Sequence, residues 1–408
     1  MLKSSSLKMP FGTITITDKA KRLIAEILAS SRISNGKYVR EFEQRFASLF
    51  NVAHAVAVSS GGDAVALALS VLYDQEIDRG LGYEIIVPAL SFVATGNAVL
   101  QAGFTPVFVD IERETLNINP SLIEDVITAR TAAVLPVHLI GKSADMEAIA
   151  CLANKYDVAV IEDAAEAYGM GYKERHFAEL SHMATFSTYI AHAVSTGEGG
   201  VVATNNQCYA EILRSLRSHG RACICESCML NTQEGAYCQK RFAQGSDKRF
   251  VSERIGFSSK MNELEAAIGL GSLDEYSEIM AQRYRNLAYL KDEFRKRFGS
   301  YFCIIKQSSD EVIGPHAFPF ILKEDVGFTR TQLMQYLEQN SIETRTLFAS
   351  MPTQCAGFEF LGYELGDFPE AEYVGENGIH VGVHQDLTME HLDYFIEVMK
   401  KFLEEHIR

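Results

Sequence analysis

The sequence predicts an α/β fold: a large domain built on a mainly parallel sheet, followed by a smaller C-terminal α/β domain. Between residues 54 and 205, short Val-rich apolar runs alternate with apolar helical stretches, and a shorter alternation follows from about 300 to 408. Strands that are apolar along their whole length indicate a sheet covered on both faces, and strand–helix alternation favours parallel connections. A chain of 408 residues is long enough for two such cores.

Seven segments of the large domain have the length and composition of buried strands. They are His54–Val58, Glu84–Val87, Thr105–Val109, Ala132–Val137, Val158–Glu162, Ala184–Thr188 and Gly200–Thr204. The helical stretches between them include Ala64–Leu72, Thr95–Ala102 and Met146–Lys155. Ligands of parallel sheets bind at the carboxyl ends of the strands, so we expect the chemistry just after each strand.

Elements on either side complete the predicted organisation. Residues 18–32 read as an amphipathic helix, and one long helical stretch, roughly Asn262–Phe298, leads out of the large domain. A strand at His316–Leu322 and a helix at Thr329–Gln339 belong to the small domain. The predicted limits are 1–34 for an N-terminal helix and arm, 35–275 for the large domain with a cysteine-rich insert at 219–250, and 276–408 for the small domain.

Composition excludes several classes of partner. Hydrophobic residues make up 47% of the chain and charged residues 22%, which is ordinary for a soluble globular protein. The net charge of −15, with no basic run to offset it, argues against nucleic acid. No stretch reaches the length of a membrane span, and the first residues lack the apolar core of a signal peptide. We therefore expect a cytoplasmic protein with neither nucleic acid nor membrane as partner.

Four of the eight cysteines fall within sixteen residues: Cys223, Cys225, Cys228 and Cys238. In a reducing cytoplasm, so tight a cluster indicates a metal site rather than disulfides. Four thiolates can bind zinc or a two-iron two-sulfur cluster. The spacing C-x-C-x2-C-x9-C is not the paired C-x2-C of a common zinc ribbon. Zinc, free thiols and disulfides remain alternatives to the iron–sulfur cluster.

The turn Ser59-Ser-Gly-Gly-Asp-Ala64 follows the first predicted strand and opens a helix. Small residues let the backbone approach an anion closely, and a helix N-terminus presents free N–H groups to it. We therefore predict phosphate contacts from the backbone at Gly62 and Asp63. Alone the motif is weak, because any strand-to-helix turn can be rich in glycine.

The segment Phe186-Ser-Thr-Tyr-Ile-Ala-His-Ala-Val-Ser-Thr-Gly-Glu-Gly-Gly200 carries a family resemblance. It resembles the active-site strand and turn of the DegT-type nucleotide-sugar aminotransferases, which have the type I fold and depend on pyridoxal phosphate. The resemblance implies that Ser187 holds the cofactor phosphate. Where the family has its Schiff-base lysine, this chain has His192, and an imidazole cannot form a stable Schiff base because that needs a primary amine. We therefore expect pyridoxamine 5′-phosphate, held without a covalent bond.

Further motifs match the same family. In Pro88-Ala-Leu-Ser-Phe-Val-Ala-Thr-Gly-Asn97, Phe92 matches the aromatic residue that stacks on the cofactor ring. Asp163, at the end of a strand, matches the carboxylate that keeps the pyridine nitrogen protonated and makes the ring an electron sink. Ser258 stands in a loop that, in family members, reaches the site of the neighbouring subunit and contacts the cofactor phosphate there. The resemblance therefore implies a homodimer. His138 is expected to be structural.

Three residues resemble one branch of the family, the 3-dehydratases of nucleotide-linked 4-keto-6-deoxyhexoses. In that branch a histidine replaces the lysine, as His192 does here, and a tyrosine precedes the histidine by three residues, as Tyr189 does. An acid also stands where aminotransferases commonly carry His or Gln, and in this chain that acid is Glu166. The cysteine spacing resembles the iron–sulfur members, the CDP-4-keto-6-deoxyglucose 3-dehydratases. This implies a [2Fe-2S] cluster supplied with electrons by a separate NAD(P)H-dependent iron–sulfur flavin reductase. Arg345 and Tyr189 are the implied substrate contacts.

The function implied is C-3 deoxygenation of a nucleotide-linked 4-keto-6-deoxyhexose. His192 is expected to be the base, with a pKa suited to neutral pH, and Asp163 to stabilise the electron-rich ring. Two alternatives stay open. One is a glutamate-coupled 3-dehydratase or sugar aminotransferase-like protein without a redox cluster. The other is a non-catalytic relative, against which the retained Ser187, Asp163 and Phe92 count.

Overall fold

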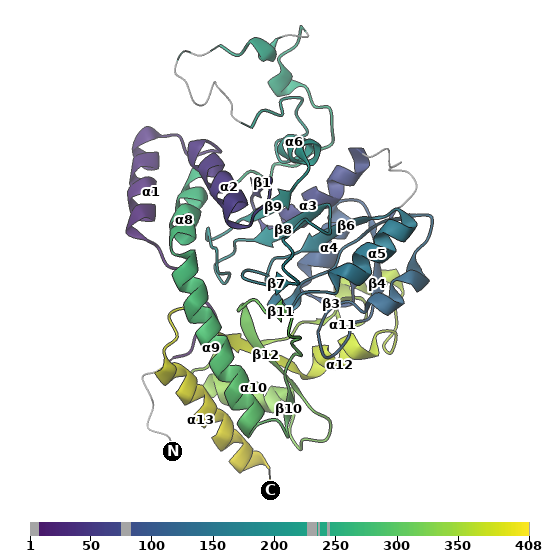
Figure 1. The fold of residues 1–408 in the computed structure, drawn as a ribbon, viewed down its shortest axis with the longest axis vertical. Helices are drawn as coiled ribbons and strands as arrows, with labels where there is room; N and C mark the ends of the chain where they lie inside the picture. Colours follow the sequence, from purple (N-terminus) through teal and green to yellow (C-terminus); the bar gives the residue numbers. More distant parts are fainter. Residues whose placement is uncertain (1–7, 75–82, 227–234, 236, 243–244, 408) are drawn as a thin grey trace.

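A seven-stranded sheet forms the centre of the large domain in the computed structural model, which describes residues 8–74, 83–226, 235, 237–242 and 245–407 (Figure 1). Its order is β1-β9-β8-β6-β5-β2-β4. The bounds are β1 His54–Val58, β2 Glu84–Pro88, β4 Thr105–Val109, β5 Thr131–Val134, β6 Ala159–Asp163, β8 Met183–Ser187 and β9 Gly200–Thr204. The strands from β4 to β8 pair in parallel, whereas β9 runs antiparallel to both β8 and β1. The prediction of a mainly parallel sheet is confirmed.

Helices cover both faces of this sheet, as the apolar strands predict. The helices of the large domain are α1 Asp18–Ser30, α2 Lys37–Leu49, α3 Gly61–Val71, α4 Ala94–Gln101, α5 Met146–Tyr156 and α6 Gln207–Leu216. Neighbouring residues of one strand point to opposite faces. In β1, Val56 and Val58 join the core that contains residues of α3, while Ala55 and Ala57 join the core that contains residues of α2.

The predicted single helical stretch from Asn262 to Phe298 is wrong in one respect. It is two helices, α8 Glu263–Asp274 and α9 Tyr276–Arg297, separated at Glu275. The Asn262 side chain caps α8 with a complete capping box. The helix α8 packs on α1 and α2, whereas α9 continues toward the small domain (Figure 1). Neither Gly nor Pro marks the break, so the pattern reads as continuous.

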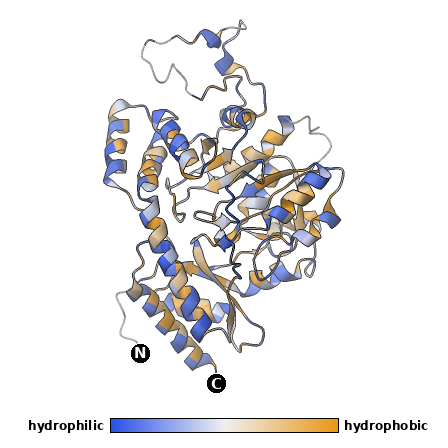
Figure 2. Ribbon diagram, in the orientation of Figure 1, coloured by the Kyte–Doolittle hydropathy of each residue, from blue (hydrophilic) through white to orange (hydrophobic). Residues whose placement is uncertain are grey.

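A four-stranded antiparallel sheet forms the small domain, in the order β10-β12-β15-β13. The bounds are β10 Phe302–Cys303, β12 Ala317–Leu322, β13 Thr344–Thr346 and β15 Gly378–Gly382. The helices around it are α9, α10 Arg330–Gln339, α11 Met351–Gln354, α12 Pro369–Asn377 and α13 Met389–His406. The N-terminal segment joins this domain through a bridge between Met9 and Ile342. The strands of both sheets are mainly hydrophobic, while the outer faces of the surrounding helices are largely hydrophilic (Figure 2).

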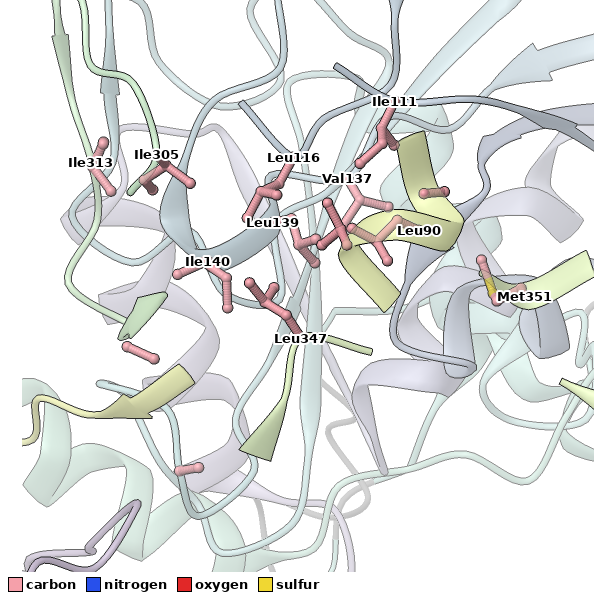
Figure 3. Close-up of a cluster of buried hydrophobic side chains, with 14 of the residues drawn as sticks. Leu90, Ile111, Leu116, Val137, Leu139, Ile140, Ile305, Ile313, Leu347 and Met351 are labelled. Carbon is pink, nitrogen blue, oxygen red and sulfur yellow. The ribbon is translucent and has the colours of Figure 1, made fainter. Parts of the chain in front are cut away.

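Two short ladders and a buried apolar cluster join the domains. The ladders pair β3 Leu90–Ser91 with β14 Ala349–Ser350, and β7 Gly171–Tyr172 with β11 Glu311–Val312. Figure 3 shows the cluster, where side chains such as Leu139 and Ile140 lie near Leu347 of the small domain. Gly141, at φ 76°, accepts a hydrogen bond from the N–H of Gly314 at 2.8 Å. A Cβ at Gly141 would lie 2.2 Å from the Gly314 oxygen, so this contact requires glycine.

Within the part of the chain that the structure describes, no helix combines the length and apolar character needed to cross a membrane. The described residues that follow α6 extend away from the body of the fold (Figure 1). This is the region of the predicted cysteine-rich insert.

Candidate active site

A cavity of about 770 Å³ lies at the carboxyl ends of β6 and β8, and both domains line it. Its walls include most of the residues predicted from the sequence: Gly62, Phe92, Asp163, Glu166, Ser187, Tyr189, His192 and Arg345. They come from separate segments of the chain, and the order of the strands brings them together. The volume is ample for a small organic cofactor with part of a substrate, since ligand cavities commonly measure about 300–1,000 Å³.

The first turn of α3 forms one end of the cavity. A Cβ at Gly61 would lie 2.7 Å from the Ser187 Cβ, so glycine lets the Ser187 side chain lie against the helix N-terminus. A Cβ at Gly62 would meet nothing closer than the Ser60 hydroxyl, at 3.8 Å. The N–H groups of this first turn have no acceptor within the helix. Together with the Ser187 hydroxyl they make a suitable anion site.

Asp63 and Ser258 do not line the cavity. The Asp63 N–H donates to the Ser60 side chain at 3.0 Å, and the Ser59 hydroxyl donates to the Asp63 carboxylate. The Asp63 N–H, which the sequence suggested as a phosphate contact, is thus used in the helix cap. The N–H groups of Gly61 and Gly62 remain available to a phosphate. Ser258 is exposed and forms a bridge with Ser218. Its contact with a neighbouring subunit stays a prediction.

Asp163 ends β6 as a buried carboxylate. Its Oδ2 accepts a 2.9 Å hydrogen bond from the Thr95 hydroxyl, and its Oδ1 accepts one from the Ala165 N–H at 3.2 Å. Burial raises the pKa of Asp163, and these two hydrogen bonds oppose the rise. No salt bridge to this carboxylate forms among the described residues. A buried carboxylate oriented by neutral donors fits a cationic ring nitrogen well.

His138 is structural, as expected. It is fully buried, its Nε2 lies 2.9 Å from Glu162 Oε2, and its Nδ1 accepts the Ala144 N–H at 3.1 Å. Both ring nitrogens are therefore used to hold the strand ends beside Asp163.

Phe92 and Tyr189 present aromatic surface to the cavity. Phe92 is 57% exposed despite its position between two buried segments, and its ring centroid lies 5.8 Å from that of Phe348. Tyr189 is 40% exposed, and its N–H donates to the Ser187 hydroxyl at 3.3 Å. Exposed aromatic faces inside a cavity are available to stack on a flat ring.

His192 lies in the turn after β8, where its N–H donates to the Tyr189 carbonyl at 3.0 Å. Its Nδ1 is buried, with no hydrogen-bond partner in the described chain. Burial, followed by the positive charges of Arg283 and Arg345, lowers the pKa of His192 to about 3. The imidazole is therefore neutral at pH 7, as a base must be. This pKa lies below the value near neutrality expected from the sequence, and an anionic ligand would offset the two arginines.

Two arginines supply the positive charge. The Arg345 guanidinium lies 3.7 Å from the ring centroid of Phe11, and its side chain keeps 43% exposure. Its nearest acidic partner among the described residues, Glu343, is 4.0 Å away, so Arg345 remains available to an anion. Arg283 is 1% exposed and donates to the Ala191 carbonyl at 3.3 Å, which fixes the backbone beside His192.

The sequence does not mark Arg283 or His316, whereas His380 falls in Gly378–Leu387, a segment that resembles one lining the sugar site in the dehydratase branch. His316 and His380 both line the cavity, and the ring centroid of His316 lies 5.1 Å from that of His192. Nδ1 of His380 is buried without a partner among the described residues, and burial together with Arg345 lowers the pKa of His380 to about 3. His316 opens the strand that was predicted, but no local motif marks it as a site residue.

Glu166 reaches the cavity from the turn after β6. Its Oε2 accepts the Ile140 N–H at 2.7 Å, and its Oε1 lies 3.4 Å from His316 Nε2. Burial is the main reason that the pKa of Glu166 is raised to about 7. The carboxyl therefore exchanges its proton near neutral pH.

Three of the four clustered cysteines fall among the described residues, while Cys228 lies outside them. Burial raises the pKa of the Cys225 thiol, with further contributions from the charge of Cys223, a hydrogen bond with it, and the charge of Cys238. The Cys225 thiol is thus close enough to interact with those of Cys223 and Cys238, and the described cysteines are free of disulfides. Within the described ranges, no group of three or more His, Cys, Asp or Glu side chains is arranged to hold a metal ion.

Comparisons with known proteins find relatives over nearly the whole chain. The family model described as DegT/DnrJ/EryC1/StrS aminotransferase family matches residues 15–400. The dTDP-4-dehydro-2,6-dideoxy-D-glucose 3-dehydratase of Saccharopolyspora spinosa is 32% identical, over 97% of this chain and 86% of that protein. The lipopolysaccharide biosynthesis protein RfbH of Salmonella typhimurium is 31% identical, over 98% of this chain and 92% of that protein.

A solved structure of similar fold is the GDP-4-keto-6-deoxymannose-3-dehydratase ColD, as a His-to-Asn variant with bound GDP-perosamine. It superimposes with a TM-score of 0.84 at 28% identity, covering 96% of this chain and 100% of that one. The expected type I fold is confirmed. With a family model matching nearly its whole length, the chain belongs to the DegT/DnrJ/EryC1/StrS aminotransferase family.

Proposed function

We propose that this protein is a pyridoxamine-phosphate-dependent enzyme that removes the C-3 hydroxyl of a nucleotide-linked 4-keto-6-deoxyhexose. The observation that carries the proposal is His192, which lines the cavity where an aminotransferase of this family needs a primary amine. Relatives named as 3-dehydratases of dTDP- and GDP-linked sugars support it.

The cavity residues fit the cofactor. When bound, pyridoxamine phosphate supplies a primary amine for the 4-keto group and a ring that accepts electron density. The first turn of α3 and the Ser187 hydroxyl would hold its phosphate, and Asp163 would pair with its ring nitrogen. Phe92 would cover one face of the ring. The E. coli GDP-4-keto-6-deoxy-D-mannose-3-dehydratase has been solved with bound hydrated PLP, in line with a cofactor held without a tether.

His192 would act as the base. Its neutral imidazole has a free, buried Nδ1, and no primary amine competes with it at this position. The Arg283 contact to the Ala191 carbonyl holds the turn that carries it. Arg345, at the small-domain wall, would bind an anionic or carbonyl group of the substrate together with Tyr189.

We further propose that Cys223, Cys225, Cys228 and Cys238 hold a [2Fe-2S] cluster, through which an NAD(P)H-dependent iron–sulfur flavin reductase delivers single electrons. The spacing of the four residues supports this proposal, as does the position of Cys225, whose thiol interacts with those of Cys223 and Cys238. A homodimer, in which the Ser258 loop reaches the partner's cavity, belongs to the same proposal.

A second candidate is a glutamate-coupled 3-dehydratase or aminotransferase without a redox cluster. Two comparisons favour it. GDP-perosamine synthase of Caulobacter vibrioides is 31% identical. A GDP-4-keto-6-deoxymannose-3-dehydratase has been solved with a trapped PLP-glutamate geminal diamine. In this alternative the clustered cysteines carry no iron.

Anaerobic purification separates the two candidates. Iron and sulfide analysis, absorption spectra and turnover of a panel of CDP-, GDP- and dTDP-linked 4-keto-6-deoxyhexoses would be measured with either a reductase or glutamate. We expect equimolar iron and sulfide, and deoxygenation with the reductase only. Cys225→Ser should lose iron and reductase-driven turnover, while Cys208→Ser, at an exposed cysteine outside the cluster, should lose neither. An iron-free protein that turns over with glutamate would establish the second candidate instead.

A further inference from the structure

Glu166 and His316 face one another across the junction of the two domains. Glu166 belongs to the turn after β6, and His316 immediately precedes β12. Both line the cavity, and Glu166 Oε1 lies 3.4 Å from His316 Nε2. The role proposed for His192 uses neither of them.

The Glu166 carboxyl is held in a fixed orientation. The Ile140 N–H donates to Oε2 at 2.7 Å, and Ile140 itself is buried in the apolar cluster between the domains (Figure 3). Oε2 is thereby occupied, which leaves Oε1 on the side of His316. The side chains of Glu166 and His316 keep only 14% and 6% exposure, so the pair is largely shielded from bulk water.

Loss of a hydroxyl requires an acid as well as a base. One proton leaves carbon, and its electron pair becomes a new double bond. The C-3–O bond breaks with its electron pair on oxygen, and that oxygen needs one proton to depart as water. His192 supplies the first transfer, so the second has no assigned donor. Enzymes that run both transfers at neutral pH commonly use two groups whose environments differ.

On the basis of the proposed function, we propose that Glu166 is the acid that protonates the departing C-3 hydroxyl, and that His316 is the positioning residue that holds and tunes the Glu166 carboxyl. After the step, the Glu166 carboxylate lies beside the His316 imidazole, which can donate an N–H to it. The step consumes no oxidant and no reductant, because only a proton moves to the oxygen.

The charges around the pair are consistent with a carboxyl that is protonated part of the time. Asp163 raises the pKa of Glu166 by repulsion, and Arg345 lowers it. Burial is the main cause that disfavours a proton on His316. The charges of four neighbours disfavour it further: His192, His380, Arg283 and Arg345. The proton that the pair holds therefore resides on Glu166, not on the imidazole.

Infrared spectroscopy of the ligand-free protein tests the pair without any turnover. A protonated carboxyl band that disappears with a midpoint near pH 7 should be present in the parent and absent from Glu166→Gln. His316→Phe removes the imidazole that stabilises the carboxylate, so the midpoint should move upward; His316→Asn, which keeps a polar side chain, covers the case in which the Phe variant folds poorly. His380→Phe is the matched control, since it removes another cavity imidazole with no ion pair to Glu166, and the midpoint should stay.

Turnover adds the catalytic test. At saturating pyridoxamine phosphate, Glu166→Gln should dehydrate roughly 10²–10⁴-fold more slowly than the parent. His316→Phe should shift the pH profile of kcat in the same direction as the infrared midpoint. A parent midpoint near the ordinary glutamate value, or full activity in Glu166→Gln, would overturn the proposal. If the parent dehydrates none of the sugars, the proposed function fails, and the infrared titration alone then decides whether the pair exists.

Discussion

The Thr95 hydroxyl donates a 2.9 Å hydrogen bond to Asp163 Oδ2 and is itself 2.9 Å from the Ser91 hydroxyl. This chain of neutral donors starts at Ser91 in β3, continues through Thr95 in α4 and ends on the carboxylate at the end of β6. Neutral donors orient the Asp163 carboxylate without cancelling its charge. The negative charge of Asp163 is therefore available to a cationic group of a ligand. In the proposed function this group is the protonated ring nitrogen of the cofactor.

Asp163→Asn should weaken pyridoxamine phosphate binding strongly. The substitution keeps the size of the side chain and removes the charge, and a hydrogen bond to a charged group contributes about 1.5–3 kcal/mol. This corresponds to roughly 10- to 150-fold in the dissociation constant. Thr95→Val should cost less, on the order of 1 kcal/mol, because the carboxylate keeps its charge. Fluorescence titration of ligand-free protein measures both, with Ser70→Ala as a control, since Ser70 bonds within α3. Equal affinity in Asp163→Asn and the parent would contradict the assignment.

Gly61→Ala should disturb the anion site, whereas Gly62→Ala should not. The added Cβ at Gly61 would lie 2.7 Å from the Ser187 Cβ, so the β8 end or the helix must shift. At Gly62 the nearest atom is 3.8 Å away, so the same substitution meets open space. We expect Gly61→Ala to lower both Tm and cofactor affinity, and Gly62→Ala to leave both nearly unchanged. Thermal denaturation and cofactor titration provide the comparison, and a reversed order of the two variants would contradict it.

Local pattern predicts the strand ends of this site, whereas the roles expected of the residues there come from the family resemblance. The strands end where their apolar runs end, so the positions of Asp163 and Ser187 at strand ends follow from the sequence alone. The Gly-rich turn also has a local signal, although the use of the Asp63 N–H in the helix cap does not. The break at Glu275 could not be read, because the residues on both sides favour helix.

Local pattern alone does not place the small-domain residues His316 and His380 in the cavity. His316 and His380 enter the cavity only because β12 and β15 pair and because the domain junction sets their distance from β6. Arg283 is one of six cations in the 22-residue helix α9, and nothing in the sequence distinguishes it from its exposed neighbours. Burial is the main cause of the low pKa of His192, and the two arginines that lower it further come from outside its own segment.

Stability should fall as the pH drops from about 7 toward 4, and His380 should account for part of the loss. The pKa of His380 in the folded protein is lowered to about 3, whereas an unfolded histidine has a pKa of 6.5. The unfolded chain therefore binds more protons in this window, and stability decreases with falling pH by at most about 1.4 kcal/mol per pH unit for one such group.

His380→Phe should flatten this dependence. Glu166 acts in the opposite sense, because its raised pKa lets the folded state take up a proton, so only the difference between variant and parent is informative. Urea denaturation at several pH values between 4 and 7 measures that difference. His176→Phe, at an exposed histidine of the large domain, is the control. An identical slope in His380→Phe and the parent would show that His380 titrates normally in the folded protein.

His192→Lys should restore covalent capture of pyridoxal phosphate. The same features that lower the pKa of His192, burial and the charges of Arg283 and Arg345, should also lower the pKa of a lysine there. A larger neutral fraction favours Schiff-base formation, so the variant should turn yellow with pyridoxal phosphate and keep the cofactor on peptide 192 after borohydride reduction. Deoxygenation should fall sharply, because the tether competes with the free amine cofactor.

His192→Asn has no amine and should bind the cofactor without a tether, while losing roughly 10²–10⁴-fold in the rate of proton transfer. Both variants would be compared with the parent under anaerobic conditions, using the same panel of nucleotide-linked 4-keto-6-deoxyhexoses. If His192→Asn dehydrates as fast as the parent, the base is another residue, and His316, whose ring centroid is 5.1 Å from that of His192, becomes the first to replace.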